Sequence, residues 1–260
     1  MSTRTSTVEA PSAHMAAPGR VMFLGLPFDR LTQAEVLSLL AARPANAGFG
    51  FVVTPNVQHV AMAERDSALP PIYGAAWLSL CDSRPVRMLG RLLGQDLPLV
   101  TGSDLTVALF DEVIRPGDRI AIVCAREALA DTLAARYPGL HWVSHVPPPG
   151  TEPGAPAFDQ AVDFLARSNA RFVFVGLGAP KSEAMCFAAQ QRPEASGTAL
   201  CTGAALEFLV GQKTRAPKAM QKLGLEWLHR MASEPGRLAG RYAGAVLPLL
   251  RLFLRELRGR

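Results

Sequence analysis

The first 200 residues alternate between short apolar runs and segments of helical periodicity. Runs rich in β-branched and other apolar residues predict strands at 20–29, 48–56, 75–82, 118–125, 140–146, 170–178 and 197–203. Helices are predicted between them at 32–42, 57–66, 103–114, 126–137, 158–168 and 180–191, several after a Ser, Thr or Asp that can cap a helix. Such alternation is typical of a mostly parallel sheet covered by helices. We therefore predict an α/β fold with a mostly parallel sheet flanked by helices.

The pattern changes after residue 212. Residues 213–260 predict two or three helices and no further strand, and a helix over 218–231 has an apolar face that includes Trp227. At the other end, residues 1–20 lack the continuous apolar core of a signal peptide and are typical of a disordered leader. We therefore expect a leader at 1–20, a sheet-bearing domain at 21–212 and a helical C-terminal appendage at 213–260.

Charge is distributed unevenly along the chain. The net charge is +5, but residues 213–260 hold 11 Lys and Arg against 3 Asp and Glu and so carry +8, which leaves −3 elsewhere. The appendage is therefore expected to meet a negatively charged partner. A solvated helix face is one alternative; nucleic acid is disfavoured because the basic residues are interleaved with long apolar ones and the aromatic residues form no stacking series.

Basic residues along the border of an apolar helix face are typical of binding to a membrane surface. The longest apolar run, 243–254, contains Pro248 and Arg251 and falls short of the 18 or so residues that a spanning helix needs. We therefore expect the appendage to lie on a membrane. An apolar tail of this kind also suits self-association, so a homo-oligomer is an alternative.

Composition and cysteine usage indicate the compartment. Apolar residues make up 49% of the chain and charged residues 19%, which is a globular composition. The four cysteines, Cys81, Cys124, Cys186 and Cys201, lie far apart, with no CxxC pair and no His at metal-ligand spacing. They are expected to be buried thiols of a reducing compartment rather than metal ligands. We therefore predict a cytoplasmic protein without a bound metal.

In a parallel sheet, ligands bind beyond the carboxyl ends of the strands. The candidate site residues are therefore those at the ends of the strands: Thr54, Asn56, Asp82, Gly102, Ser103, Asp104, Gly176, Gly178, Ala179, Pro180, Lys181, Ser182, Glu183, Thr202 and Gly203.

The turn from Gly176 to Lys181 is the clearest candidate for a phosphate site. A strand leads into two glycines and a proline at a helix start, where freed amides and the helix dipole favour an anion. The spacing matches neither the dinucleotide fingerprint nor the ordinary P-loop. Plain turn chemistry explains the glycines equally well, and Lys181 favours the phosphate interpretation.

Three polar residues after strands each have a structural alternative. Thr54 and Asn56 suit sugar hydroxyls or a diphosphate, but Asn56 also fits the cap of the next helix, and we favour the cap. Asp82 at the rim of the sheet is able to accept a proton from an attacking hydroxyl, or it caps a helix. Gly102 lies in a turn that permits close approach of a ligand, beside Ser103 and Asp104, whose expected role is capping.

Five stretches together resemble the WecG/TagA/CpsF family of bacterial glycosyltransferases, over about residues 21–242. They read "TPN", "CDS", "VTGSDL", "VGLGAPKSE" and "TGAALEFLVGQKTRAPKAMQKLGLEWLHRMASEPGRL". The resemblance implies a Rossmann-like, metal-independent, inverting transferase without a cofactor. Such an enzyme moves a sugar from a UDP-sugar to a polyprenyl-diphosphate-linked saccharide. Residues 21–212 would then be the catalytic domain, and 213–260 a membrane-facing lid at the inner face of the cell membrane.

The resemblance also implies residue roles. The general base of the family falls on Asp82, its pocket residues fall on Thr54 and Asn56, and its glycine loop near the nucleotide diphosphate falls on 176–181. Its C-terminal arginines, which fold over the pocket, fall on Arg230 and Arg237. A third arginine is replaced by Gly240, and Arg241 is the neighbouring substitute.

Two further departures bear on specificity. Family members commonly carry Gln where this chain has Ser182, and a basic residue where it has Leu99. The expected reaction is glucosyl, N-acetylmannosaminyl or uronosyl transfer in cell-surface polysaccharide synthesis, with exopolysaccharide favoured. The alternative is a non-catalytic peripheral membrane scaffold of a polysaccharide assembly machine. A dehydrogenase is a weaker alternative because the dinucleotide fingerprint is missing.

Overall fold

The protein is described by a computed structural model that covers residues 19–214, 216–217, 220 and 235–259. Its main sheet has the strand order β4-β3-β8-β7-β5-β6, and each neighbouring pair is parallel. The strands are β3 (Gly50–Val53), β4 (Leu78–Ser79), β5 (Arg119–Val123), β6 (His141–His145), β7 (Phe172–Val175) and β8 (Thr198–Cys201). The predicted α/β fold with a mostly parallel sheet is confirmed.

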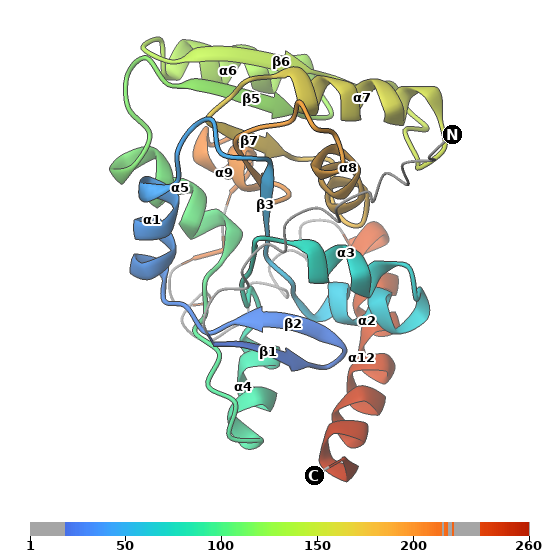
Figure 1. Ribbon diagram of the computed structural model, residues 1–260. Helices are drawn as coiled ribbons and strands as arrows, with labels where there is room; N and C mark the ends of the chain where they lie inside the picture. The colour runs from blue at the N-terminus through green and yellow to red at the C-terminus, as the bar shows by residue number, and fades with distance from the viewer. Residues whose placement is uncertain (1–18, 215, 218–219, 221–234, 260) are drawn as a thin grey trace, which may run out of the picture.

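Helices cover both faces of this sheet (Figure 1). The helices up to β8 are α1 (Gln33–Ala42), α2 (Val57–Arg65), α3 (Leu69–Ala75), α4 (Arg84–Leu92), α5 (Gly102–Glu112), α6 (Glu127–Arg136), α7 (Pro156–Arg167) and α8 (Lys181–Gln190). They are followed by α9 (Ala205–Leu209) and α12 (Pro235–Arg258). The pattern predicted α1, α2, α5, α6, α7 and α8, but not α4 or the short helices α3 and α9.

Alternate strand residues build two separate cores, because successive side chains point to opposite faces. Phe51, Val53 and Val173 face a core closed by α2, α3, α7 and α8. Val52 and Phe174 face the core beneath α1, α5, α6 and α9. Both faces of the central strands are therefore buried, which explains why their sequences are continuously apolar.

The prediction of a single strand over 20–29 is wrong. The structure divides it into β1 (Arg20–Phe23) and β2 (Leu26–Asp29), an antiparallel hairpin outside the main sheet. The turn residues Leu24 and Gly25 have φ values of 51° and 77°, the positive values that a tight hairpin turn requires. Arg20, assigned to the leader, in fact begins β1, and the remaining leader residues 1–18 lie outside the described part of the chain.

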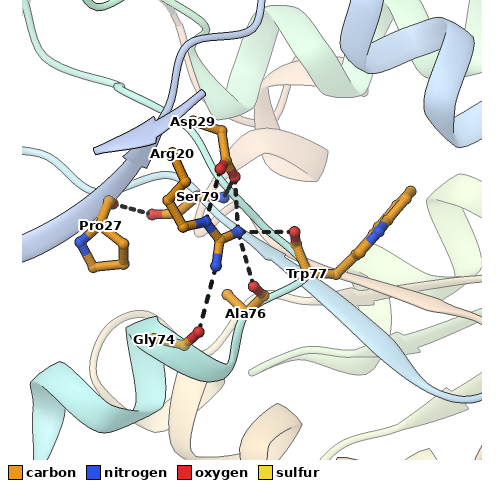
Figure 2. Close-up of polar contacts among 7 residues, drawn as sticks. All are labelled: Arg20, Pro27, Asp29, Gly74, Ala76, Trp77 and Ser79. Atoms are coloured by element: carbon orange, nitrogen blue, oxygen red, sulfur yellow. Dashed lines mark hydrogen bonds and ion pairs between the residues drawn. The ribbon is translucent and has the colours of Figure 1, made fainter. Parts of the chain in front are cut away.

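A buried ion pair fastens this hairpin to the edge of the sheet (Figure 2). The Arg20 guanidinium donates to both carboxylate oxygens of Asp29, at 2.7 and 2.9 Å, and also to the carbonyls of Ala76 and Trp77. Asp29 in turn accepts the backbone N–H of Ser79 in β4 at 2.7 Å. The hairpin therefore fixes the short edge strand that leads to Asp82.

α12 packs against α2 along the side of the molecule (Figure 1). Arg65 of α2 donates to the carbonyl of Gly244, and the backbone N–H of Leu24 donates to Glu256 at 2.9 Å. α12 is thus held at two points, by α2 and by the turn of the β1–β2 hairpin. The helix predicted over 218–231 lies outside the described residues, except for residue 220.

In the described part of the chain, no helix combines the length and the apolar character needed to cross a membrane.

The Arg20–Asp29 pair generates a stability prediction. Asp29→Asn leaves the largely buried Arg20 without its counter-charge, so we expect the free energy of unfolding to fall by about 3 kcal/mol or more. Urea unfolding at unchanged m-value measures this. Asp96→Asn is the matched control, because Arg91 and Asp96 are 57% and 78% exposed, and it should change stability by no more than about 0.5 kcal/mol. Equal effects of the two variants would contradict the prediction.

Candidate active site

Four neighbouring strands end at one edge of the sheet, and each is followed by predicted site residues. In the order β4-β3-β8-β7, the strands lead to Asp82, to Thr54 and Asn56, to Thr202 and Gly203, and to the 176–182 turn. β8 follows β3 by almost 150 residues in the sequence, yet it pairs with β3 from Gly50↔Thr198 to Val53↔Cys201. The sheet order therefore gathers residues that are distant in sequence.

Asp82 does not cap the helix that follows it. Ser83 is the N-cap of α4, and its hydroxyl accepts the backbone N–H of Val86 at 3.2 Å. Asp82 Oδ2 instead accepts the backbone N–H of Gly102 at 3.3 Å. The capping alternative is wrong for Asp82, whose half-buried carboxylate lies across the site at the start of α5.

Gly102 lies closely between two threonines. A Cβ atom at this position would be 3.1 Å from Thr54 Oγ1 and 3.3 Å from Thr202 Cβ, so only glycine fits without displacement. Thr101, rather than Ser103 or Asp104, caps α5 by accepting the N–H of Asp104 at 3.1 Å. The structure thus brings Thr54, Asp82, Gly102 and Thr202 into one contiguous group.

The glycine turn joins this group from the next strand. A Cβ atom on Gly176 would be 3.2 Å from the carbonyl oxygen of Gly203, and Gly178 and Gly203 have φ values of 83° and 57°. Ser182 is buried, and its hydroxyl donates to the carbonyl of Gly178 at 3.3 Å. Ser182 therefore supports the turn from inside, and α8 begins one residue after Pro180, at Lys181.

Lys181 forms an ion pair with Glu152 at 2.6 Å, between side chains that are 34% and 59% exposed. A pair as exposed as this contributes little to stability. Ala179 and Pro180 complete the turn. A role for Lys181 in phosphate binding remains a prediction.

Asn56 performs the capping role favoured from the sequence. Its Oδ1 accepts the N–H of Gln58 at 3.0 Å, and its own backbone N–H donates to His59 Nδ1 at 3.2 Å. A role for Asn56 in substrate binding stays a prediction. The sequence pattern did not single out His59, whereas its neighbour Glu183 of α8 ends the predicted 176–183 stretch and lies within "PKSE".

The arginines of the appendage are only partly described. Arg230 lies outside the described residues, and Arg237 and Arg241 belong to the first two turns of α12. Leu99 lies beside Cys81 in a parallel bridge next to Asp82. Leu99 is therefore at the rim of this site.

The cysteine thiols in and near the site are unreactive. All four cysteines are free and buried, as predicted. Burial raises the pKa of Cys81 to about 12, so the thiol next to Asp82 stays protonated and is a poor nucleophile at neutral pH. Among the residues that the structure describes, His, Cys, Asp and Glu form no group of three that could hold a metal ion.

One comparison with known proteins bears on this arrangement. Residues 21–260 match the family model described as the glycosyl transferase WecG/TagA/CpsF family, nearly the whole length of the chain.

The close packing around Gly102 predicts a kinetic effect. Gly102→Ala should leave α5 folded but displace Thr54, so we expect the rate of glycosyl transfer to fall about tenfold or more. Gly74→Ala in α3 is the matched control, because a Cβ there meets nothing within 4 Å. Initial rates of both variants, with melting curves, test the expectation. A Gly102→Ala enzyme as fast as Gly74→Ala would contradict it.

Proposed function

Because this chain belongs to the WecG/TagA/CpsF family of glycosyl transferases, which act in cell-surface polysaccharide synthesis, we propose that it moves a hexosyl group from a UDP-sugar to a polyprenyl-diphosphate-linked saccharide. The observation that carries the proposal is the position of Asp82. Its carboxylate accepts the Gly102 N–H at the point where β4 and β3 end, and Ser83 has taken over the helix cap.

The proposed reaction is a single in-line displacement. A hydroxyl oxygen of the acceptor sugar forms a bond to the anomeric carbon while the bond from that carbon to the UDP oxygen breaks. The hydroxyl proton passes to the Asp82 carboxylate, and UDP leaves with the bonding electron pair. Attack opposite the leaving group inverts the anomeric configuration, and Asp82 acts as the general base.

Charge on the departing diphosphate has to be stabilised. The candidates are the backbone amides of the glycine turn, at the start of the ten-residue helix α8, because a helix N-terminus favours phosphate. Gly178 and Gly203 allow a ligand to approach the backbone closely. Arg230, Arg237 and Arg241 are proposed to reach the same diphosphates, so that the reaction proceeds without a metal.

The transferred sugar is proposed to be of the glucosyl, N-acetylmannosaminyl or uronosyl type, in exopolysaccharide synthesis. Leu99 beside Cys81 and Ser182 under the glycine turn replace the polar residues that relatives commonly carry there. Leu99 lies at the rim of the site and Ser182 lies beneath the glycine turn. Both residues are therefore proposed to alter the binding of the donor or the acceptor.

α12 supports a peripheral position at the inner face of the cell membrane. Its inner face, with Leu249, Leu252 and Phe253, packs on the core. Its outer face carries an apolar stripe whose side chains are 42–63% exposed: Val246, Leu247, Leu250, Leu254 and Leu257. Arg251, Arg255 and Arg258 are exposed along the border of this stripe. An open apolar stripe bordered by arginines suits an anionic bilayer surface.

α4 supports the same orientation. Its outer face exposes Met88 and Leu92, at 60% and 69%, next to the exposed Arg84 and Arg91. In Figure 1, α4 and the C-terminal end of α12 both extend past the β1–β2 hairpin at one end of the molecule. Since α4 begins directly after Ser83, contact of this end with a bilayer would bring Asp82 close to a lipid-linked acceptor.

The base assignment predicts the effect of Asp82→Asn. The amide oxygen can still accept the Gly102 N–H, so the variant should fold, but it cannot take the proton, and kcat should fall by about 100-fold to 10,000-fold. UDP binding should be retained. Asp131→Asn on the exposed face of α6 is the control and should keep full turnover. Near-normal turnover of Asp82→Asn would contradict the assignment of Asp82 as the general base. A wild-type chain that neither binds UDP nor transfers a sugar would favour the scaffold alternative.

The stripe predicts membrane binding. Each leucine moved from water into an apolar layer contributes about 1.5 kcal/mol to the binding free energy. The triple change Leu247→Ser, Leu250→Ser, Leu254→Ser should therefore weaken binding to anionic vesicles by about 100-fold. Leu39→Ser on α1, 38% exposed, is the control and should bind as wild type. Unchanged vesicle binding of the triple variant would refute the contact. A wild-type dimer that becomes a monomer in the triple variant would instead assign the stripe to self-association.

A further inference from the structure

A buried Glu–His contact joins two loops of the site from beneath. His59 lies in the first turn of α2, after the Thr54–Asn56 loop, and Glu183 lies in the first turn of α8, after the glycine turn. His59 Nε2 is 3.5 Å from Glu183 Oε1, and the two side chains are only 14% and 2% exposed. The contact therefore connects the loops that follow β3 and β7, with the β8 loop between them.

The other ring nitrogen of His59 is already committed. Its Nδ1 accepts the backbone N–H of Asn56 at 3.2 Å, within the capping box of α2. A ring nitrogen that accepts a hydrogen bond carries no proton, so the neutral imidazole carries its proton on Nε2. Nε2 is the ring atom that lies 3.5 Å from Glu183 Oε1. The Glu183 carboxylate is therefore placed to favour the tautomer in which His59 Nδ1 accepts the backbone N–H of Asn56.

The environment of Glu183 argues for a role other than stability. A buried carboxylate is costly unless its oxygens are hydrogen-bonded, yet among the described residues Glu183 Oε2 has no hydrogen-bond partner. Tyr73 of α3, fully buried, lies edge-on to His59 with ring centroids 6.0 Å apart, and its hydroxyl also has no hydrogen-bond partner there. Burial, and then the Glu183 charge, raise the pKa of Tyr73, so its hydroxyl stays protonated beside the carboxylate. An apolar residue at position 183 would avoid the cost of burying a carboxylate.

We propose that Glu183 and His59 are positioning residues for glycosyl transfer: Glu183 fixes the His59 ring, and the ring holds the Thr54–Asn56 loop in place opposite the glycine turn. The inference rests on the proposed function for its kinetic consequences. Its structural part, the tautomer, is independent of the reaction. Small displacements of a loop that lines a reacting centre are enough to lower turnover.

The tautomer is tested directly on the wild-type full chain by 15N NMR of the imidazole rings at neutral pH. We expect His59 to show the Nε2–H tautomer alone. His141, exposed on β6, is the internal control and should show the mixture of an unconstrained ring. A His59 ring in the Nδ1–H form, or in the same mixture as His141, would overturn the proposal. This measurement requires no variant and no substrate.

The kinetic test uses three variants of the buried cluster. Glu183→Ala removes the acceptor for His59, so kcat should fall about tenfold or more while KM for the UDP-sugar changes less than about threefold. Glu183→Gln keeps an acceptor oxygen in the same place and should restore both the tautomer and most of kcat. Tyr73→Phe removes only a hydroxyl without a described partner and should behave as wild type.

The outcomes separate this inference from the proposed function. If the wild-type chain transfers a sugar but Glu183→Ala, folded by its melting curve, keeps the wild-type kcat, the positioning role is wrong and the transferase assignment stands. A Glu183→Gln variant as slow as Glu183→Ala also contradicts the role assigned to the acceptor oxygen. If the wild-type chain shows no transfer from any UDP-sugar while His59 is fixed as Nε2–H, the proposed function fails and the structural part of the inference stands.

Discussion

The parallel pairing of β3 with β8 is the interaction on which the site depends. Its register ends at Val53 and Cys201, so Thr54 and Thr202 emerge side by side, and the glycine at position 102 fits between them. The pairing requires a special residue at the start of β8. Gly197 has a φ of 91°, and a Cβ there would lie 2.1 Å from the carbonyl oxygen of Ala170. A single side chain at position 197 would push β8 away from its place.

The two faces of the sheet carry different kinds of contact. The face under α1, α5, α6 and α9 is an apolar core, whose stability follows from burial alone. The opposite face holds the buried contacts Arg20–Asp29 and His59–Glu183, together with the hairpin and α12. Replacing a buried ion pair by apolar residues of similar volume is often neutral or stabilising, so such contacts are weak evidence for stability. Arg20–Asp29 holds β4 through the backbone N–H of Ser79, and His59–Glu183 is proposed to fix the loops before α2 and α8.

α12 has two apolar sides, one packed on the core and one exposed. Its inner side completes the core beside α2, and its outer stripe has no cover within the described part of the chain. Because Arg65 and Leu24 hold the helix at two points, the stripe has a fixed direction relative to the site. The proposed membrane contact through this stripe would therefore also set the orientation of the proposed active site.

The sequence by itself determined the class of fold and the candidate residues, because buried parallel strands are continuously apolar and glycine or polar residues must follow them. It misassigned 20–29, since one glycine in an apolar run does not reveal a hairpin, and it left Asp82 undecided between cap and base. Only the tertiary structure decided that Ser83 takes the cap, that β8 lies between β3 and β7, and that Glu183 lies near His59. The physical reason is that strand order and buried polar contacts arise from pairing between segments far apart in the chain, and a local pattern of apolar and polar positions does not contain that information.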